Sequence, residues 1–246
     1  MANEFKSILM IGGSSEIGFG ILEELSKRSL ESVHVIGRDP KNLEEKFGKL
    51  REIKQLATSA SKMEVDLETQ IFKLFQHNYF DIVLIAVGQM MNQDALSRNP
   101  NLVLAANEGN VSIPTIALLS TIKCFEAQGF GHVAVLGSVA GDRGRNINVI
   151  YGAGKAYLET VCEGIWQRIF RSKIKLTLVK PGPTDTKMSR SIHTSTIKMS
   201  SVQDVSRTIV QGISRRKRIV YAPHRWCYIM AIIRLLPRWI YVRTNF

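Results

Sequence analysis

Residues 8–20 read ILMIGGSSEIGFG, an apolar run that passes directly into a glycine-rich turn. The run predicts a buried strand, and the amphipathic segment 17–29 that follows predicts a helix. Glycines at a strand-to-helix turn let the backbone approach a pyrophosphate, whose charge the helix N-terminus attracts. Tight turns also use glycine for conformational reasons alone. In an α/β chain this turn predicts a dinucleotide-binding site that includes Gly12, Ser14, Ser15, Ile17 and Gly18.

Short apolar runs alternate with amphipathic stretches along the chain. Further strands are predicted at 33–36, 63–65, 82–87, 133–136 and 176–179, and helices near 41–54, 67–77, 100–128 and 151–172. This alternation predicts an α/β fold, a Rossmann-type doubly wound parallel sheet with helices on both faces. With 246 residues, 45% of them hydrophobic and 22% charged, the chain is typical of one globular domain. We assign residues 1–222 to that domain and 223–246 to a basic, aromatic C-terminal extension.

Cysteine usage and the N-terminus point to the cytoplasm. Cys124, Cys162 and Cys227 are odd in number and far apart, which predicts reduced core thiols and no metal or redox motif. The first strand begins by about residue 7, which leaves no room for a signal peptide.

The positive charge is concentrated at the C-terminal end. Net charge is +12, and residues 205–246 carry nine Lys or Arg and no Asp or Glu, which leaves +3 for the first 204 residues. This asymmetry predicts an anionic partner for the end of the chain: phospholipid headgroups, a phosphate-bearing substrate or nucleic acid.

Two sites after the second and third predicted strands bear on the choice of cofactor. An acidic residue at the end of the second strand would bind a ribose diol and favour NAD(H), but Gly37 stands there. The next residue, Arg38, can pair with a 2′-phosphate, which favours NADP(H) over NAD(H), unless it is a surface residue at the start of a helix. Asp66 either contacts the adenine or caps the helix that begins at Leu67.

A candidate catalytic set lies in the second half of the chain. Tyr151 and Lys155 are four residues apart, so on a helix they share one face, while Ser138 ends a preceding strand. The phenol has a reference pKa of about 10, and a value near 7 requires roughly 4 kcal/mol of phenolate stabilisation, which a nearby ammonium can supply. Asn110, on an earlier helix, could support a water chain to Lys155 or be a satisfied polar residue. A surface Tyr–Lys pair is the alternative interpretation.

Strand carboxyl ends supply the remaining candidates, because open α/β sheets bind ligands there. Ala86 and Gly88 follow the fourth predicted strand and would let a cofactor lie against the backbone. Pro181 and Gly182 follow the sixth, with Thr184 and Thr186 placed to hold a nicotinamide carboxamide. A rigid turn is compatible with that role.

Over residues 6–222 the order and spacing of these motifs resemble the short-chain dehydrogenase/reductase family. The family pattern is a T-G-x-x-x-G-x-G turn, N-A-G, an Asn, a Ser, Y-x-x-x-K and P-G-x-x-x-T. The matches are Gly12 and Gly18, Ala86-Val87-Gly88, Asn110, Ser138, Tyr151 with Lys155, and Pro181-Gly182 with Thr186. The resemblance implies that Tyr151 is the catalytic acid/base, Lys155 lowers its pKa and binds the nicotinamide ribose, Ser138 holds the carbonyl oxygen and Asn110 completes the relay.

Three departures from this pattern concern the cofactor pocket. Ile11 replaces the usual Thr, Glu16 the middle Gly, and Ala86-Val87 the N-A pair. We expect the Glu16 side chain to turn to solvent or to a ribose hydroxyl, away from bound phosphates.

The G-G-S-S-E-I-G turn, the A-V-G stretch and the basic tail are similar to one branch of the family, the decaprenylphosphoryl-2-keto-pentose reductases. That resemblance implies reduction of a 2-keto sugar on a polyprenyl-phosphate carrier, a cell-envelope glycan precursor. The alternatives are reduction of a soluble or acyl-type ketone, and a non-catalytic, cofactor-sensing binding protein. We expect a homo-oligomer.

The tail contains an unbroken apolar run at 226–233, followed by apolar residues interleaved with arginine. It is too short and too charged to span a bilayer, which needs about 20 apolar residues. Such a pattern favours an interfacial helix on an anionic membrane, through residues 215–246, or a grip on a polyprenyl phosphate. A lid or an oligomer-interface helix is the alternative. No nucleic-acid module accompanies the tail, so we expect no nucleic-acid partner.

Overall fold

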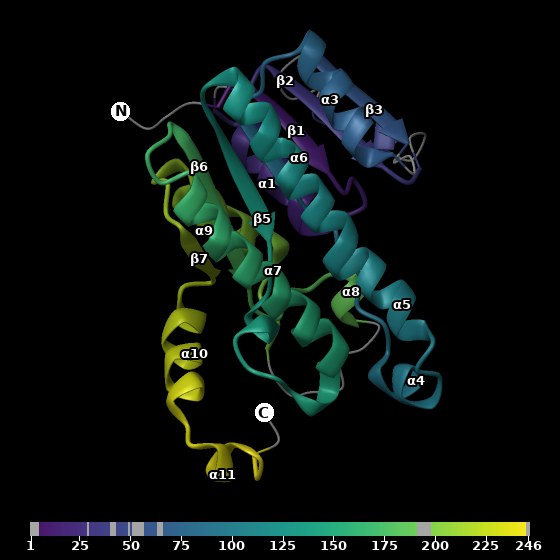
Figure 1. Cartoon of the computed structure of the whole chain (residues 1–246), viewed down its shortest axis with the longest axis vertical. Helices are drawn as coiled ribbons and strands as arrows, with labels where there is room; N and C mark the ends of the chain where they lie inside the picture. The colour runs from purple at the N-terminus through teal and green to yellow at the C-terminus, as the bar shows by residue number, and fades with distance from the viewer. Residues whose placement is uncertain are drawn as a thin grey trace.

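The computed structural model describes residues 5–28, 30–39, 43–48, 50, 57–62 (backbone only), 66–190 and 198–244. Within these residues the strands form one parallel sheet in the order β3-β2-β1-β4-β5-β6-β7 (Figure 1). The order reverses between β1 and β4, which confirms the predicted doubly wound topology. The strands are β1 (Ser7–Ile11), β2 (Ser32–Gly37), β3 (Ala57–Lys62), β4 (Ile82–Ile85), β5 (Gly131–Leu136), β6 (Ile174–Pro181) and β7 (Ile219–Ala222).

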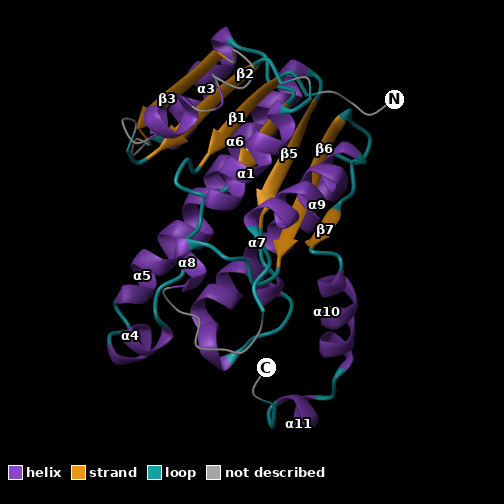
Figure 2. Cartoon of the chain, turned by 180° about the vertical axis from the view of Figure 1, so that it is seen from behind, coloured by secondary structure: helices purple, strands orange, loops and turns teal. Residues whose placement is uncertain are grey.

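Helices cover both faces of the sheet (Figure 1, Figure 2). In β1, Ile8 and Met10 pack into one core, and Leu9 and Ile11 into the other, as the alternation of side chains in a strand requires. The first core includes α1 (Glu16–Ser26) and α9 (Val202–Ser214). The second includes α3 (Leu67–His77), α6 (Ile113–Gln128) and α7 (Val149–Arg168).

One long helical stretch, Leu102–Gln128, is apolar and long enough to cross a membrane by length and composition. It consists of α5 (Leu102–Asn107), the π-helical turn η1 (Glu108–Ser112) and α6. Its α6 part places Leu118, Ile122 and Phe125, all fully buried, in the core on one face of the sheet. We therefore treat it as a core helix of this fold.

Several elements differ from the sequence expectations. The strand expected at 63–65 lies outside the described residues, and the third strand is β3, whose sequence ATSASK has no apolar run. Of the helix expected at 41–54, the described residues are 43–48 and 50, and all of these are helical. The fourth strand ends at Ile85, two residues early. The sequence analysis missed α4 (Gln93–Arg98), α8 (Lys187–Arg190), α9, β7 and the short 3₁₀ turns η2 (Val139–Gly141) and η3 (Asn146–Asn148).

The cysteines are free, as expected, but only two of them are core residues. Burial raises the pKa of the Cys124 thiol to about 11 and that of Cys162 to about 12, so both stay protonated and unreactive. Cys227 is exposed, because it lies on the outer side of the helix that follows β7.

Beyond β7 the chain forms α10 (Arg225–Leu235) and α11 (Arg238–Tyr241), which extend past the carboxyl ends of the strands (Figure 2). Trp226, Met230 and Ile233 pack with Val139 in a small core of their own. Part of the apolar run is therefore buried within the protein. The opposite side of these helices exposes an apolar stripe, in which each residue is between 64% and 83% exposed: Tyr228, Ile232, Leu235 and Trp239.

Arg143 and Tyr241 hold this tail against the loop before α7. The Arg143 guanidinium donates hydrogen bonds of 2.7–3.0 Å to the carbonyls of Ile233, Arg234 and Leu236, the last carbonyls of α10 and its cap. It also lies 4.2 Å from the ring centroid of Tyr241, whose hydroxyl donates to the Gly144 carbonyl. The tail and the loop thus form one unit.

Candidate active site

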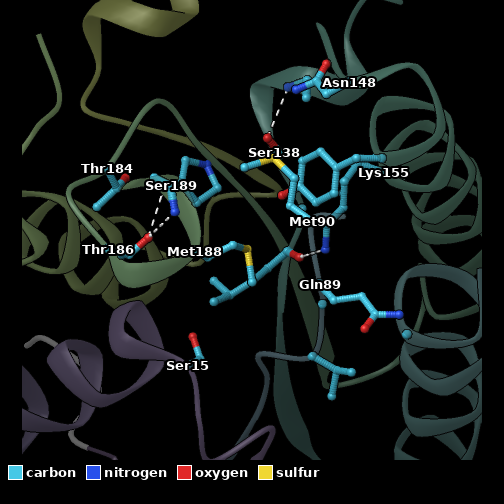
Figure 3. A pocket seen from close by; sticks show the side chains of 18 of the residues that line it. Ser15, Gln89, Met90, Ser138, Asn148, Lys155, Thr184, Thr186, Met188 and Ser189 are labelled. Carbon is cyan, nitrogen blue, oxygen red and sulfur yellow. Dashed lines mark hydrogen bonds between the residues drawn. The ribbon is translucent and has the colours of Figure 1, made fainter. Parts of the chain in front are cut away.

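A cavity of 1680 Å³ lies at the carboxyl ends of the strands, between the glycine-rich turn, the N-terminus of α7 and the tail. In Figure 3, Ser15 lies at one end, Ser138, Lys155 and Asn148 gather at the other, and Thr184, Thr186 and Ser189 approach from the side. Most predicted site residues line this cavity: Gly12, Ser14, Ser15, Ile17, Arg38, Ala86, Gly88, Ser138, Tyr151, Lys155, Pro181, Gly182, Thr184 and Thr186. Gly18, Asp66 and Asn110 are not among its lining residues.

The glycine-rich turn brings backbone close to backbone. Gly12 has a φ of 103°, and its N–H donates to the Ile36 carbonyl at 2.9 Å. A Cβ at Gly12 would lie 2.7 Å from the carbonyl carbon and oxygen of Ala86, so only glycine fits. Ser15 caps α1 by accepting from the N–H of Gly18 at 3.0 Å. Gly18 allows α1 to pack closely on β1, because a Cβ at this position would lie 2.3 Å from the Met10 methyl.

Glu16 is half-buried. Its carboxylate accepts a hydrogen bond of 2.7 Å from the backbone N–H of Lys187, the first residue of α8. This partner was not expected, and a contact of Glu16 with a ribose hydroxyl stays a prediction. The glycine-rich turn is instead joined to the segment that follows Pro181 and Gly182.

The two residues assigned to the adenosine half of the cofactor differ in their surroundings. Asp66 caps α3 by accepting from the Thr69 N–H at 3.1 Å, and hydrogen bonding from the Thr69 side chain, and then from this N–H, holds the carboxyl pKa below its usual value. The helix-cap interpretation of Asp66 thus applies, and its contact with adenine stays a prediction. Arg38 lies exposed at the cavity, directly after β2, where its pairing with a 2′-phosphate also stays a prediction.

The structure brings Ser138, Tyr151 and Lys155 together. The Ser138 side chain lies close enough to the Tyr151 phenol to act on its pKa, and the Ser138 hydroxyl accepts from the Ala140 N–H at 3.1 Å. The Lys155 ammonium lies 5.7 Å from the centroid of the Tyr151 ring and donates to the Leu136 carbonyl at 3.0 Å. These are a phenol, a hydroxyl and an ammonium in one pocket, a set that can hold and protonate an oxygen.

Burial dominates the electrostatics of this set. Burial raises the pKa of Tyr151, whereas the Ser138 side chain and then the charge of Arg145 act to lower it. Burial also lowers the pKa of Lys155 to about 8. The lowering of the Tyr151 pKa that we expected from Lys155 is not seen here. Arg145, a residue that the sequence analysis missed, acts to lower the Tyr151 pKa instead. Burial lowers the pKa of Arg145 itself.

Asn110 supports the site from behind. It lies in η1, is 2% exposed, and its amide exchanges two hydrogen bonds with the backbone of Gln89 and donates a third to Ala106. A Cβ at Gly88 would lie 3.1 Å from the Lys155 nitrogen and 3.4 Å from the Asn110 oxygen. The side chain is thus the satisfied polar group of our alternative interpretation, and its part in a water chain stays a prediction.

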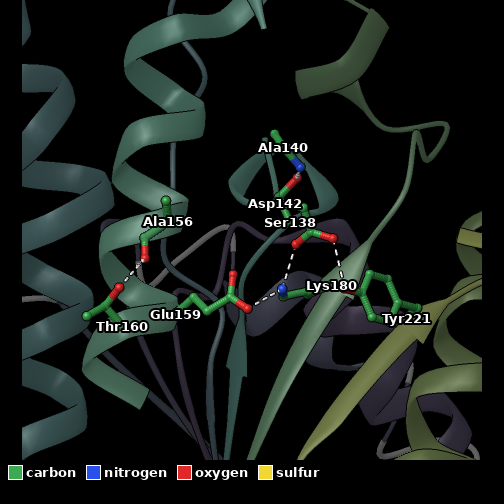
Figure 4. Close-up of polar contacts among 8 residues, drawn as sticks. All are labelled: Ser138, Ala140, Asp142, Ala156, Glu159, Thr160, Lys180 and Tyr221. Atoms are coloured by element: carbon green, nitrogen blue, oxygen red, sulfur yellow. Dashed lines mark hydrogen bonds and ion pairs between the residues drawn. The ribbon is translucent and has the colours of Figure 1, made fainter. Parts of the chain in front are cut away.

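Two further groups of residues at the site escaped the sequence analysis. Tyr241, Val242 and Thr244 of the tail line the cavity. The other group is buried beside it: Lys180 pairs with Asp142 and Glu159, and Asp142 also accepts from the Tyr221 hydroxyl (Figure 4). A single lysine inside the apolar strand run LTLVKP was the available signal.

Comparison with known proteins agrees with this geometry. The family model for short chain dehydrogenases matches residues 6–196. An uncharacterized oxidoreductase from the mprA 5′ region of Streptomyces coelicolor is 26% identical over 242 residues, 97% of this chain and 95% of that protein. An uncharacterized oxidoreductase of Staphylococcus epidermidis is 23% identical over 215 residues, 87% of this chain and 93% of that protein.

Solved structures share the fold. A short-chain dehydrogenase from Sphingobium yanoikuyae in complex with NADPH superposes with a TM-score of 0.81 at 19% identity, covering 95% of this chain and 97% of that one. One from Burkholderia cenocepacia in complex with NADP gives 0.80 at 17% identity, covering 99% and 98%. Because the family model spans well over half of the sequence and the motifs meet in one cavity, this chain belongs to the short-chain dehydrogenase family, whose members are NAD(P)-dependent oxidoreductases.

Proposed function

We propose that the protein is an NADPH-dependent reductase that converts a ketone to a secondary alcohol. The observation that carries this proposal is the meeting of Ser138, Tyr151 and Lys155 in one pocket, with the Lys155 ammonium 5.7 Å from the centroid of the Tyr151 ring. All three residues line the same cavity as the glycine-rich turn. A proton donor and a dinucleotide cradle therefore share one space.

The residues of the cavity fit a dinucleotide. Gly12 leaves no side chain between the turn and β4, and the uncapped N–H groups at the start of α1 suit a pyrophosphate. Arg38, with Gly37 before it, favours NADPH because a guanidinium pairs with the 2′-phosphate. The structural neighbours that hold NADPH and NADP support this choice. When bound, the nicotinamide supplies the hydride for the carbonyl carbon.

The chain supplies the proton. The Ser138 hydroxyl donates a hydrogen bond to the substrate carbonyl oxygen and holds it beside the phenol of Tyr151. As the carbonyl carbon is reduced, Tyr151 transfers its phenolic proton to that oxygen, which leaves an alcohol and a phenolate. The charge of Arg145, which acts to lower the Tyr151 pKa, stabilises the phenolate, and solvent returns the proton by way of Lys155 and the region of Asn110.

For the substrate we propose a 2-keto sugar carried on a polyprenyl phosphate, reduced at the inner surface of the cytoplasmic membrane. Supporting it, the tail forms part of the cavity wall through Tyr241, Val242 and Thr244. The same tail exposes the apolar stripe of α10 and α11, and the residues from 205 onward carry only positive formal charge. An interfacial helix pair with these features would bring the cavity next to a lipid-linked substrate, which supports the proposal.

The test follows NADPH oxidation with two substrates, a polyprenyl-phosphoryl 2-keto-pentose in anionic phospholipid vesicles and a soluble ketone. The matched variants are Tyr151→Phe and Tyr157→Phe, since Tyr157 lies exposed on the same helix outside the cavity. We expect Tyr151→Phe to bind NADPH normally and to lose reduction by about 10²-fold or more, and Tyr157→Phe to match the wild type. Turnover retained in Tyr151→Phe contradicts the mechanism; turnover of the soluble ketone alone, without vesicle binding, contradicts the substrate.

A further inference from the structure

A buried ammonium lies where β6 reaches the cavity. Lys180 is the last residue before Pro181 and Gly182, and its side chain is only 2% exposed. Its nitrogen lies 2.5 Å from an oxygen of Asp142, which is fully buried, and forms a second ion pair with Glu159, which is 16% exposed. The other Asp142 oxygen accepts from the Tyr221 hydroxyl at 2.8 Å, and Figure 4 shows the four side chains in one chain of contacts.

The partners of Lys180 come from the segments that carry the reactive groups. Asp142 follows Ser138 by four residues and ends the η2 turn that Ser138 caps. Glu159 continues the four-residue spacing of Tyr151 and Lys155, so all three lie along one stripe of α7. Lys180 itself lies near the end of β6, just before the loop whose Gly182, Thr184 and Thr186 line the cavity. One ammonium thus connects three segments that are separate in sequence.

Each contact in this cluster is specific. Asp142 uses one carboxylate oxygen for Lys180 and the other for Tyr221, so its position is fixed from two sides. Burial, and then the hydrogen bond to Asp142, raise the pKa of Tyr221, which therefore stays a neutral donor. Lys180 and Tyr221 are also register partners on β6 and β7. The backbone pairing of these two strands therefore sets the relative positions of Lys180 and Tyr221.

We propose that Lys180 is a positioning residue for the reduction: it holds the Ser138 turn against the Tyr151–Lys155 stripe and against the cofactor loop. A buried ion pair is weak evidence for stability, since its desolvation offsets its attraction, so its geometry is the more telling property. We expect Lys180 to act by aligning the reacting groups, because a misplacement of about 1 Å among them lowers turnover by about 10²-fold. This inference rests on the proposed reductase function.

Single and combined variants separate alignment from stability. Lys180→Met alone leaves two carboxylates facing each other and is expected to unfold at lower temperature. In the triple variant Lys180→Met, Asp142→Asn, Glu159→Gln this cluster carries no charge, and we expect the melting temperature to return to near that of the wild type. We expect its kcat to stay at least tenfold lower, with the Kd for NADPH within about twofold. Glu126→Gln, which removes the exposed pair between α6 and Arg168 of α7, is the matched control and should keep wild-type kcat.

Hydrogen exchange gives a readout that needs no turnover. In the triple variant, peptides that cover 138–145 and 181–186 should exchange faster than in the wild type, while the core strands are unchanged. A triple variant that regains kcat together with stability, or whose exchange in both segments is unaltered, would overturn the positioning role. A wild-type protein that reduces no ketone would instead overturn the proposed function, and the exchange comparison would still decide whether Lys180 holds the segments.

Discussion

The carboxylate of Glu16 and the backbone N–H of Lys187 are joined by a hydrogen bond of 2.7 Å across the cavity. Both residues line it, one from the glycine-rich turn and one from the first turn of α8. Glu16 stands where the family pattern has a glycine, so its side chain makes a contact that a glycine could not make, between two segments that flank the predicted cofactor site. The contact joins two parts of the cavity wall, and we expect it to slow the release of a bound cofactor.

Glu16→Ala should therefore release NADPH faster than Glu16→Gln. Both variants remove the charge, but only glutamine keeps an acceptor for the Lys187 N–H, so their difference isolates the hydrogen bond. A bond of roughly 1 kcal/mol corresponds to about a fivefold change in release rate. Stopped-flow fluorescence of bound NADPH measures it, and equal rates for the two variants would contradict this account.

Arg38→Ala should weaken NADPH and leave NADH unchanged. Loss of a charged hydrogen bond of about 1.5–3 kcal/mol predicts a Kd for NADPH higher by about 10- to 100-fold. Titration of the wild type and the variant with NADPH and with NADH measures both Kd values. Arg171→Ala, an exposed arginine that does not line the cavity, serves as the control. An equal loss for both cofactors would show that Arg38 does not contact the 2′-phosphate.

Two glycines should respond to alanine with opposite signs. At Gly12 the φ of 103° and the Ala86 carbonyl at 2.7 Å leave no room for a methyl, so Gly12→Ala should lower the free energy of unfolding by about 1–3 kcal/mol. At Gly164, within α7, nothing lies within 4 Å, so Gly164→Ala should raise it by about 0.5–1 kcal/mol. Urea unfolding of both variants measures these changes in the free energy of unfolding. The affinity for NADPH should fall only in Gly12→Ala.

Lys155 should make stability depend on alkaline pH. Burial lowers its pKa from 10.5 to about 8, so the folded protein releases this proton before the unfolded chain does. Between about pH 8 and 10.5 the unfolded state binds more protons, and the free energy of unfolding rises with pH by up to about 3 kcal/mol from this group. Below pH 8 both states are protonated and the contribution is constant. In urea unfolding across this range, the free energy of unfolding of the wild type minus that of Lys155→Met should rise with pH, because the raised pKa values of Cys124, Cys162 and Tyr221, which lower stability there, act in both proteins.

Arg143→Met should loosen the tail without harming the cofactor half. Its guanidinium serves three carbonyls at the end of α10 and stacks on Tyr241, and Tyr241 lines the cavity. We expect the KM for the ketone to rise about tenfold, the Kd for NADPH to stay constant, and the tail to be cleaved sooner by protease. Arg215→Met, at an exposed position after α9, is the control. An unchanged KM would show that the tail does not shape the substrate site.

Local patterns were enough to predict the centre of the fold and of the site. The run Ile8 to Ile11 is fully buried as predicted, because a parallel strand between two helical layers must be apolar on both faces. The four-residue spacing of Tyr151 and Lys155 placed both at the cavity, since it depends only on helix geometry. Where a pattern was weak, as in ATSASK of β3, the element was missed.

Contacts between distant residues were beyond prediction from one sequence. Lys180 meets Asp142 and Glu159 across 38 and 21 residues, and Arg143 meets Leu236 across 93. No periodicity links such positions, because the sheet order and the path of the tail bring them together. The pKa of Tyr151 was misjudged for the same reason, since burial and Arg145 depend on tertiary packing.

The small core formed by Val139, Trp226, Met230 and Ile233 is separate from the two cores that flank the sheet. The tail that it anchors supplies one wall of the cavity, whereas the cofactor side is built from strand ends and the glycine-rich turn. Substitutions in residues 225–244 should therefore leave the two sheet cores intact and act first on Val139, Arg143 and the wall of the cavity that they contact. We expect the tail to be the part of the chain through which selection, or an engineer who keeps these contacts, can change the ketone that is accepted.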